Sequence, residues 1–224
     1  DDAPDDTRTS TAPAATASAE LEREAGRICA AAQEEFASLA EDLATAPNDP
    51  DPLAAALIRP GAEIYAKLDP KKHLELRREM PAWTQSQFLH GEQGAMLVAA
   101  QLVNAVPDME SKLYASTQVM DEARHVEVFD RYLHEKIGNT YPISPHLRSL
   151  LDRILKDSRW DMKLLGMQIM VEGLALAAFG VTRDYVEEPL LRDLTTYVIQ
   201  DEARHVAYGV LSLRDFYKDQ KESE

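Results

Sequence analysis

Cysteine is nearly absent from this sequence, because Cys29 is the only one among 224 residues. A single cysteine excludes an internal disulfide framework, and packing is its expected role. The start of the sequence shows no signal-peptide pattern, and we expect none of its hydrophobic runs to span a bilayer. These absences predict a cytoplasmic protein without a membrane partner.

Basic residues are few in relation to acidic ones, with 24 Lys and Arg against 39 Asp and Glu and a net charge of −15. This negative charge repels a phosphate backbone and an anionic lipid surface, so we expect no nucleic-acid partner. Hydrophobic residues make up 45% of the chain, which is enough for one sizeable core. One domain with a tail is therefore the expected organisation.

A five-residue motif, Asp-Glu-Ala-Arg-His, occurs twice, at residues 121–125 and 201–205. Each copy follows a lone glutamate in an apolar run, Glu92 or Glu172, and one shift of eighty positions relates the two sets. Four carboxylates and two imidazoles have the composition of a dinuclear metal site. The candidate ligands and catalytic residues are Glu92, Glu122, His125, Glu172, Glu202 and His205.

The spacing of these residues predicts an all-α fold. Glutamate and histidine three positions apart lie on one face of a helix, a turn from each other. Glu92 precedes Glu122 by thirty residues, with Pro107 near the midpoint. Glu172 precedes Glu202 by the same number, with Pro189 near the midpoint. A helix must stop at such points, so each half predicts a helical hairpin. Two antiparallel hairpins form a four-helix bundle whose interior receives all six side chains.

Apolar residues share the helical faces of the candidate ligands, so the acids are expected to be buried. A buried carboxylate costs several kcal/mol unless it is paired or binds a metal, and two divalent ions would neutralise four carboxylates. The alternative is a solvated stripe with occasional ion pairs. Two copies in register favour the metal site.

The remaining charged residues of the motifs are predicted to support the ligands. Asp121 lies four positions before His125 and is expected to reach its free ring nitrogen, as Asp201 would for His205. Arg124 and Arg204 are expected to hold these aspartates by charge-assisted hydrogen bonds. Ordinary surface ion pairs are the alternative for these four residues.

The ligand set and its flanking Asp and Arg residues resemble the ferritin-like di-iron carboxylate superfamily over roughly residues 80–215. The five-residue form is similar to that of the oxygen-activating branch: multicomponent monooxygenase hydroxylases, acyl-carrier-protein desaturases and ribonucleotide reductase small subunits. The resemblance implies a ferritin-like four-helix bundle and two iron ions that bind and reduce O2. Manganese or a mixed manganese and iron pair is the alternative metal content.

Several positions differ from those relatives. Phe129 occupies the usual place of a radical-forming tyrosine, which argues against ribonucleotide reduction. Ala175 and Leu176 occupy the turn where monooxygenases and desaturases usually have a threonine for proton delivery, and Val198 stands where arylamine N-oxygenases have an extra histidine. The reaction type and substrate therefore stay open.

The leading functional hypothesis is a non-haem di-iron oxidase or oxygenase that uses O2 to oxidise a small organic substrate, with a separate reductase or ferredoxin as electron donor. The alternative is a ferroxidase, iron-storage or peroxide-scavenging protein of the rubrerythrin or manganese-catalase type. The Cys-x-x-Cys iron site of rubrerythrins is missing. Apolar residues could line a substrate pocket or only fill the core: Phe88, Met96, Phe129, Leu176 and Phe179.

The segments outside the bundle have their own predictions. Residues 1–18 are rich in Asp, Thr, Ser, Ala and Pro and predict a flexible tail. Residues 19–80 predict additional helices that pack on the bundle or pair with a second copy, which makes a homodimer an expectation. Residues 81–218 are the predicted bundle, in which Gly91, Gly94 and Gly173 mark a widening or a close helix contact.

Overall fold

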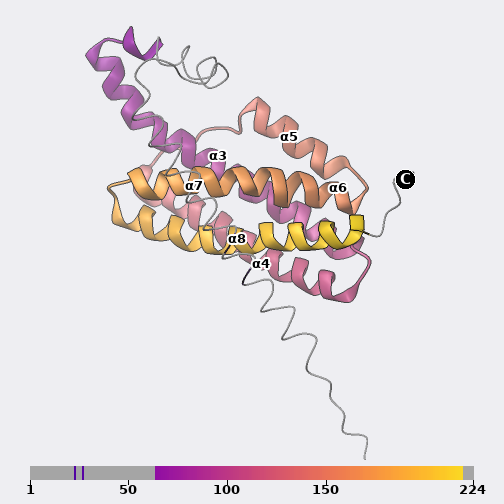
Figure 1. Cartoon of the computed structure of the whole chain (residues 1–224). Coiled ribbons are helices and arrows are strands. Elements are labelled where there is room, and N and C mark those ends of the chain that lie inside the picture. Colours follow the sequence, from indigo (N-terminus) through magenta and orange to yellow (C-terminus); the bar gives the residue numbers. More distant parts are fainter. Residues whose placement is uncertain (1–22, 24–26, 28–63, 219–224) are drawn as a thin grey trace, which may run out of the picture.

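The computed structural model describes residues 64–218, together with Arg23 and Arg27 (Figure 1). The described chain is helical and contains no strand, which confirms the all-α prediction. The predictions for residues 1–63 lie outside the described residues.

Four long helical runs make up the bundle. In chain order they are α3 (Pro70–Ala105), α4 (Met109–Tyr132), the continuous run of α6 (Trp160–Leu164), the π-helix η2 (Leu165–Val171) and α7 (Glu172–Tyr185), and finally α8 (Pro189–Lys218). α3 packs mainly against α4, α7 packs mainly against α8, and α4 contacts α8 between the two pairs (Figure 1). The bundle therefore consists of two hairpins.

Both hairpin turns lie where the prolines predict them. α3 ends at Ala105, and α4 begins after Asp108, whose side-chain oxygen accepts the backbone N–H of Ser111 at 2.7 Å. In the second turn, a side-chain oxygen of Glu188 accepts the backbone N–H of Leu191 at 2.7 Å. An acceptor at each helix start satisfies an amide that has no partner within the helix.

The first helix is longer than the sequence patterns indicate. α3 begins at Pro70, so the charged segment before residue 81 is helical, and Pro81 lies inside the helix. Asp69 caps the helix by accepting the backbone N–H of Lys72 at 2.9 Å, and proline suits the first helical position. These starting signals outweigh the break that an internal proline suggests.

The connection between the hairpins contains a π-helix and an additional α-helix. The π-helix η1 (Leu133–Ile137) ends at Gly138, whose φ of 75° suits glycine. After the predicted turn-rich segment, α5 (Pro145–Lys156) packs on α3. A Cβ atom at Gly94 would lie 2.7 Å from a methyl carbon of Leu151, so Gly94 permits a close contact with α5. For Gly94 the structure supports the close-contact alternative.

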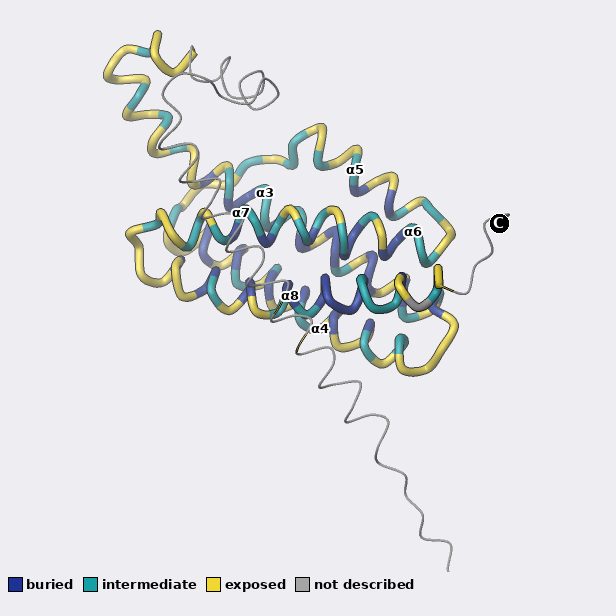
Figure 2. The backbone as a smooth tube through the Cα atoms, viewed as in Figure 1, coloured by how far each residue is buried: buried dark blue, intermediate teal, exposed yellow. Residues whose placement is uncertain are grey.

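Buried positions form the interior of the bundle along its whole length (Figure 2). They divide into two apolar clusters, one around Phe129 and Phe179 and the other around Leu102 and Met167. The six candidate ligands occupy middle positions of the four helical runs, between these clusters. The core thus encloses a polar layer.

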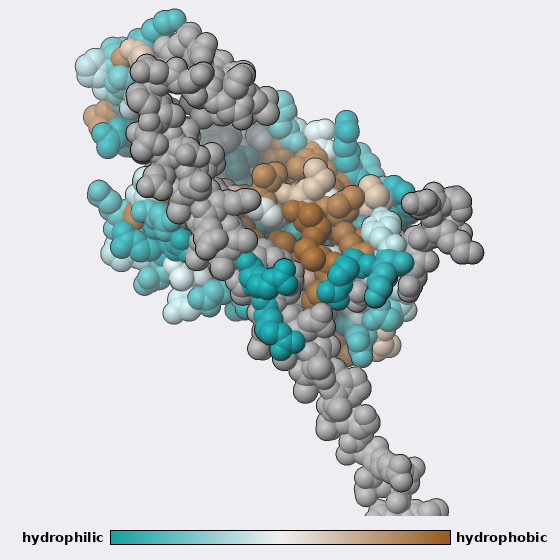
Figure 3. Space-filling model, viewed as in Figure 1, coloured by the Kyte–Doolittle hydropathy of each residue, from teal (hydrophilic) through white to brown (hydrophobic). Residues whose placement is uncertain are grey.

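One helical run changes an expectation about membranes. Residues 160–185 are long and apolar enough to cross a bilayer by length and composition, and 33% of the most apolar window is buried. Apolar side chains gather on the face that α5 and this run present in Figure 3. Within the run, Leu165, Met170 and Leu174 are exposed. The core helix of a water-soluble protein can pass the same test, and Glu172 lies on the buried side of this run. The expectation that no hydrophobic run is long enough to span a membrane was therefore wrong, because residues 160–185 have the required length and composition.

Candidate metal centre

The six candidate ligands converge in the buried centre of the bundle, and each is at most 5% exposed. Their ligand atoms form two overlapping groups in which all atoms lie within 4.8 Å of one another. The first metal position is formed by Glu92, Glu122, His125 and Glu202, and the second by Glu122, Glu172, Glu202 and His205. Glu122 and Glu202 belong to both groups, so they are the carboxylates placed to bridge two ions.

Both histidines direct Nδ1 toward the carboxylates. Nδ1 of His125 lies 3.3 Å from an oxygen of Glu92 and 3.2 Å from an oxygen of Glu202. Nδ1 of His205 lies 3.2 Å from an oxygen of Glu122 and 3.5 Å from an oxygen of Glu202. Nδ1 is therefore the imidazole atom available to a metal.

The outer ring nitrogens pair with aspartates of the opposite helix. Nε2 of His125 lies 3.2 Å from Asp201, and Nε2 of His205 lies 3.4 Å from Asp121. The predicted pairing within each motif was wrong. α4 and α8 lie next to each other, so the aspartate of one helix reaches the histidine of the other. The two hydrogen bonds join the hairpins directly.

Two arginines complete this outer layer. Arg124 donates to Asp121 and lies 3.6 Å from Asp201, while Arg204 donates to Asp201 and lies 3.9 Å from Asp121. The Arg124 side chain is 57% exposed, so the arginines face solvent while the aspartates face the histidines. The two arginines thus hold the aspartates as predicted, and each one also approaches the aspartate of the other motif.

The aspartates are ionised in this arrangement. Burial alone would raise the pKa of Asp201, but hydrogen bonds from His125 and Arg204 lower it to about 2. The pKa of Asp121 is lowered in the same way by His205 and Arg124 against the effect of burial. A carboxylate can only accept a hydrogen bond, so Nε2 of each histidine carries the proton. A neutral histidine then has its lone pair on Nδ1, toward the carboxylates.

The carboxylates are crowded enough to require positive charge. Burial, and next the charge of Glu202, raise the pKa of both Glu92 and Glu172 well above the usual value. Burial also acts to raise the pKa of Glu122, but the nearby His205 and His125 hold it well below the usual range. The carboxylates in return raise the pKa of both histidines, against the effect of burial. Protons thus balance the charge in the metal-free cluster.

Several buried ligand atoms have no hydrogen-bond partner, and this tests whether the cluster fits metal ions. They are Oε2 of Glu122, Oε2 of Glu172, Oε1 of Glu202 and Nδ1 of His205. Buried polar atoms without partners are costly, and these four are all potential metal ligands in one cluster. Carboxylate oxygens with imidazole nitrogens suit divalent ions such as Fe²⁺ or Mn²⁺. The residues therefore fit a pair of metal ions.

Sequence reasoning missed two buried glutamines beside the cluster. Gln118 donates to Glu172 at 2.9 Å and to Glu122 at 3.2 Å, and Gln168 donates to Gln118 at 3.4 Å. Both glutamines are fully buried. The signal was present, because each lies four residues before a ligand glutamate and thus on the same helical face.

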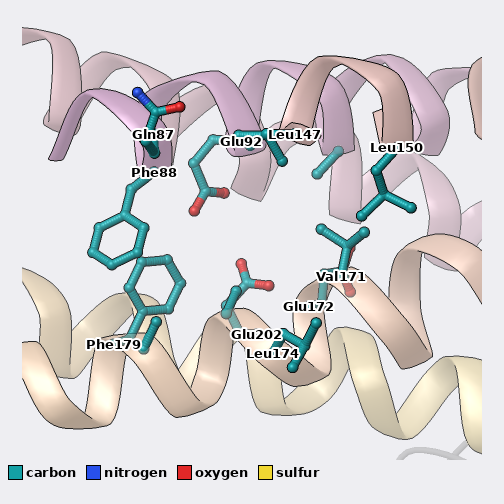
Figure 4. Close-up of a pocket in the computed structure, with 14 residues that line it drawn as sticks. Gln87, Phe88, Glu92, Leu147, Leu150, Val171, Glu172, Leu174, Phe179 and Glu202 are labelled. Carbon is teal, nitrogen blue, oxygen red and sulfur yellow. The ribbon is translucent and has the colours of Figure 1, made fainter. Parts of the chain in front are cut away.

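An apolar cavity of about 240 Å³ adjoins the cluster. In Figure 4 the carboxylates of Glu92 and Glu202 point toward one another across it, and the rings of Phe88 and Phe179 close one end. The 68% exposed side chain of Leu174 also lines the cavity, which places the mouth near it.

The candidate pocket residues divide between this cavity and the core. Phe88 and Phe179 line the cavity, whereas Phe129 and Leu176 are buried in the surrounding core. Gly91 also lines the cavity, and a Cβ atom there would meet nothing within 4 Å.

Comparisons with protein-family models, with curated proteins and with solved structures found no match for this chain. The fold and the site define a helical bundle with a buried carboxylate and histidine cluster able to hold metal ions. The likeness to di-iron carboxylate proteins rests on the ligand residues and their arrangement.

Proposed function

We propose that this protein is a non-haem di-iron oxidase or oxygenase that uses O2 to oxidise a small organic molecule. The observation that carries the proposal is the pair of overlapping ligand groups sharing Glu122 and Glu202, with an apolar cavity beside them. Storage of iron requires no such cavity, whereas oxidation of an organic substrate requires a space next to the metals.

The ligand residues divide the work between the two metal positions. Glu92 and His125 belong only to the first position, Glu172 and His205 only to the second, and the shared Glu122 and Glu202 would contribute ligands to both ions. Two ferrous ions held by these residues would supply two electrons, and the substrate two more, for the four-electron reduction of O2. A separate reductase or ferredoxin would return two electrons for the next turnover.

The lining of the cavity selects an apolar substrate. Among the described residues that line it, Gln87 is the only polar side chain apart from the ligand carboxylates. The amide of Gln87 already donates to the backbone oxygen of Pro142 at 3.1 Å and accepts the backbone N–H of Ser144 at 2.8 Å. A substrate in this cavity is therefore held mainly by contacts with aliphatic and aromatic side chains, which also exclude water.

Proton delivery must differ from a hydroxyl relay. The part of the chain that the structure describes contributes no serine, threonine or tyrosine to the cavity lining, and Ala175 occupies the turn after Glu172 where a threonine would be expected. Glu92, Glu172 and Glu202 contribute the carboxyl groups that line this space. Protons for oxygen reduction would therefore pass through these carboxyl groups or through water.

Metal content and O2 consumption test the proposal. The purified chain should bind about two metal ions in its two ligand groups, and the Glu202→Ala variant should lose both because Glu202 contributes to each group. The exposed His134 lies outside both groups, so His134→Ala is the control that should keep full metal content. Fewer than one ion per wild-type chain after anaerobic loading would contradict a dinuclear site.

The reaction with O2 separates the two functional classes. Protein loaded with Fe²⁺ should consume about one O2 per chain in a single turnover, and small apolar compounds should accelerate this and yield oxidised products detectable by mass spectrometry. The alternative, a ferroxidase, iron-storage or peroxide-scavenging protein, would continue to oxidise added Fe²⁺ into ferric mineral or would decompose peroxide. Either result without an organic product would favour the alternative.

A further inference from the structure

The two halves of the metal centre have different surroundings even though their ligands correspond. The eighty-residue shift relates Gln118, Gln168 and Gly209 to Val198, Phe88 and Phe129, respectively. The second metal position thus has a polar neighbourhood, whereas the corresponding neighbourhood of the first is apolar and aromatic. The ligands of the two halves match, but these three neighbouring positions differ, and the difference needs a functional explanation.

Gln118 holds one oxygen of each of two ligand glutamates. Its side-chain N–H groups donate to Oε1 of Glu172 at 2.9 Å and to Oε1 of Glu122 at 3.2 Å. The other oxygen, Oε2, of each glutamate has no hydrogen-bond partner. Each carboxylate is therefore oriented with one oxygen held by the protein and one left for a metal.

Gln168 and Gly209 orient Gln118. Gln168 donates to the side-chain oxygen of Gln118 at 3.4 Å, which turns the N–H groups of Gln118 toward the glutamates. A Cβ atom at position 209 would lie 2.6 Å from Cβ of Gln168, so glycine leaves the space that Gln168 occupies. The three residues act as one unit, and the two amides are named here the glutamine pair.

Glu92, which corresponds to Glu172, has no comparable support. Its hydrogen-bonding contacts in the described part of the chain are to other ligands, including His125 at 3.3 Å. Val198, in the place corresponding to Gln118, has no side-chain donor, and the nearby rings of Phe88 and Phe129 pack in a tilted arrangement with centroids 5.9 Å apart. Glu92 and Glu172 both line the cavity, but in the described part of the chain Glu172 is held by the amide of Gln118 and Glu92 is held by no amide, so Glu92 has more room to change how it binds.

We propose that the glutamine pair positions Glu172 as a one-oxygen ligand and makes the second metal position the tighter of the two, leaving the first adaptable beside the cavity. The inference rests on the proposed dinuclear site and adds an order of metal binding to it. An oriented ligand loses less freedom when a metal binds, which favours the second position. The adaptable ion then lies where Glu92 can make room for substrate or O2.

An anaerobic titration of the full chain with Co²⁺, followed by visible absorbance and calorimetry, tests this order. Wild-type protein should bind two ions in two resolved steps. The tight step should disappear in Glu172→Ala and the weak step in Glu92→Ala. Gln118→Met keeps the side-chain volume but removes the donor, and should weaken the tight step by about 10- to 100-fold. The weak step should weaken less, because only the hydrogen bond to the shared Glu122 concerns the first position.

Two further variants keep the test decisive if Gln118→Met folds poorly. Gly209→Ala retains both amides but displaces Gln168, and should weaken the tight step in the same direction. Gln85→Met is the matched control, because Gln85 is another buried glutamine of the bundle that belongs to neither ligand group. It should leave both steps unchanged.

Each outcome bears on a different claim. Two equal steps in the wild type, equal weakening of both steps in Gln118→Met, or the same effect in Gln85→Met would overturn the role of the glutamine pair. The dinuclear site would survive those results. Failure of the wild type to bind any Co²⁺ would instead remove the proposed function.

Discussion

Removing Asp201 should weaken the metal position on the opposite helix, because Asp201 supports His125 rather than the histidine of its own motif. The Asp201→Ala variant leaves Nε2–H of His125 without its acceptor at 3.2 Å. Loss of such an outer hydrogen bond typically lowers metal affinity about 10- to 100-fold, or roughly 1.4 to 2.8 kcal/mol. Nε2 of His205 keeps its contact with Asp121 at 3.4 Å, so the second position should change little.

Single-position variants make this prediction measurable. In a Glu172→Ala background only the first position retains its full ligand set, and in a Glu92→Ala background only the second does. Anaerobic Co²⁺ titration should show that Asp201→Ala acts strongly in the first background and by less than about threefold in the second. Asp121→Ala should give the opposite pattern. If Asp201→Ala instead acted strongly in the Glu92→Ala background, the crossed pairing would be refuted and pairing within each motif would be supported.

Two other substitutions test the cavity and the helix contacts. Ala178→Phe should fill much of the cavity of about 240 Å³, keep both metals, and lower substrate-dependent O2 consumption on the order of a hundredfold. The control is Ala177→Phe, because Ala177 lies outside the lining. Equal activity of the two variants would exclude this cavity as the substrate site. Gly94→Ala would place a Cβ atom 2.7 Å from Leu151 and should destabilise the chain by about 1 kcal/mol in urea unfolding. The added Cβ atom of Gly91→Ala meets open space, so this variant should raise the free energy of unfolding by about 0.5 to 1 kcal/mol. Identical changes in the free energy of unfolding for the two variants would contradict the close contact between Gly94 and α5.

The sequence predicts the ligands and the hairpins well because both depend on local spacing. Glutamate and histidine three positions apart share a helical face in any α-helix, and turn residues near Pro107 and Pro189 mark helix ends whatever the tertiary contacts. The eighty-residue repeat then places the four ligand helices in equivalent roles.

Features that depend on contacts between helices were not predictable in the same way. The partner of His125 is decided by how α4 and α8 pack, and spacing within one helix favoured Asp121 wrongly. Similarly, α5 became evident only with its packing on α3, where Gly94 meets Leu151. The position of Gln118 on the helical face of Glu122 could be read from the sequence, but its hydrogen bond to Glu172 depends on how the two hairpins pack.

Metal binding should act as a link between the two hairpins, more than as support within either one. Within each hairpin the helices pack extensively, whereas α4 and α8 have fewer contacts, which include the crossed pairs of aspartate and histidine. At free metal one hundred times above the dissociation constant, each bound ion would stabilise the fold by about 2.7 kcal/mol. Hydrogen exchange should therefore slow on metal loading at residues 118–129 and 198–209, while the exposed first turns of α3 exchange as before. Equal exchange in metal-free and loaded protein would show that the hairpins are held together without the ions.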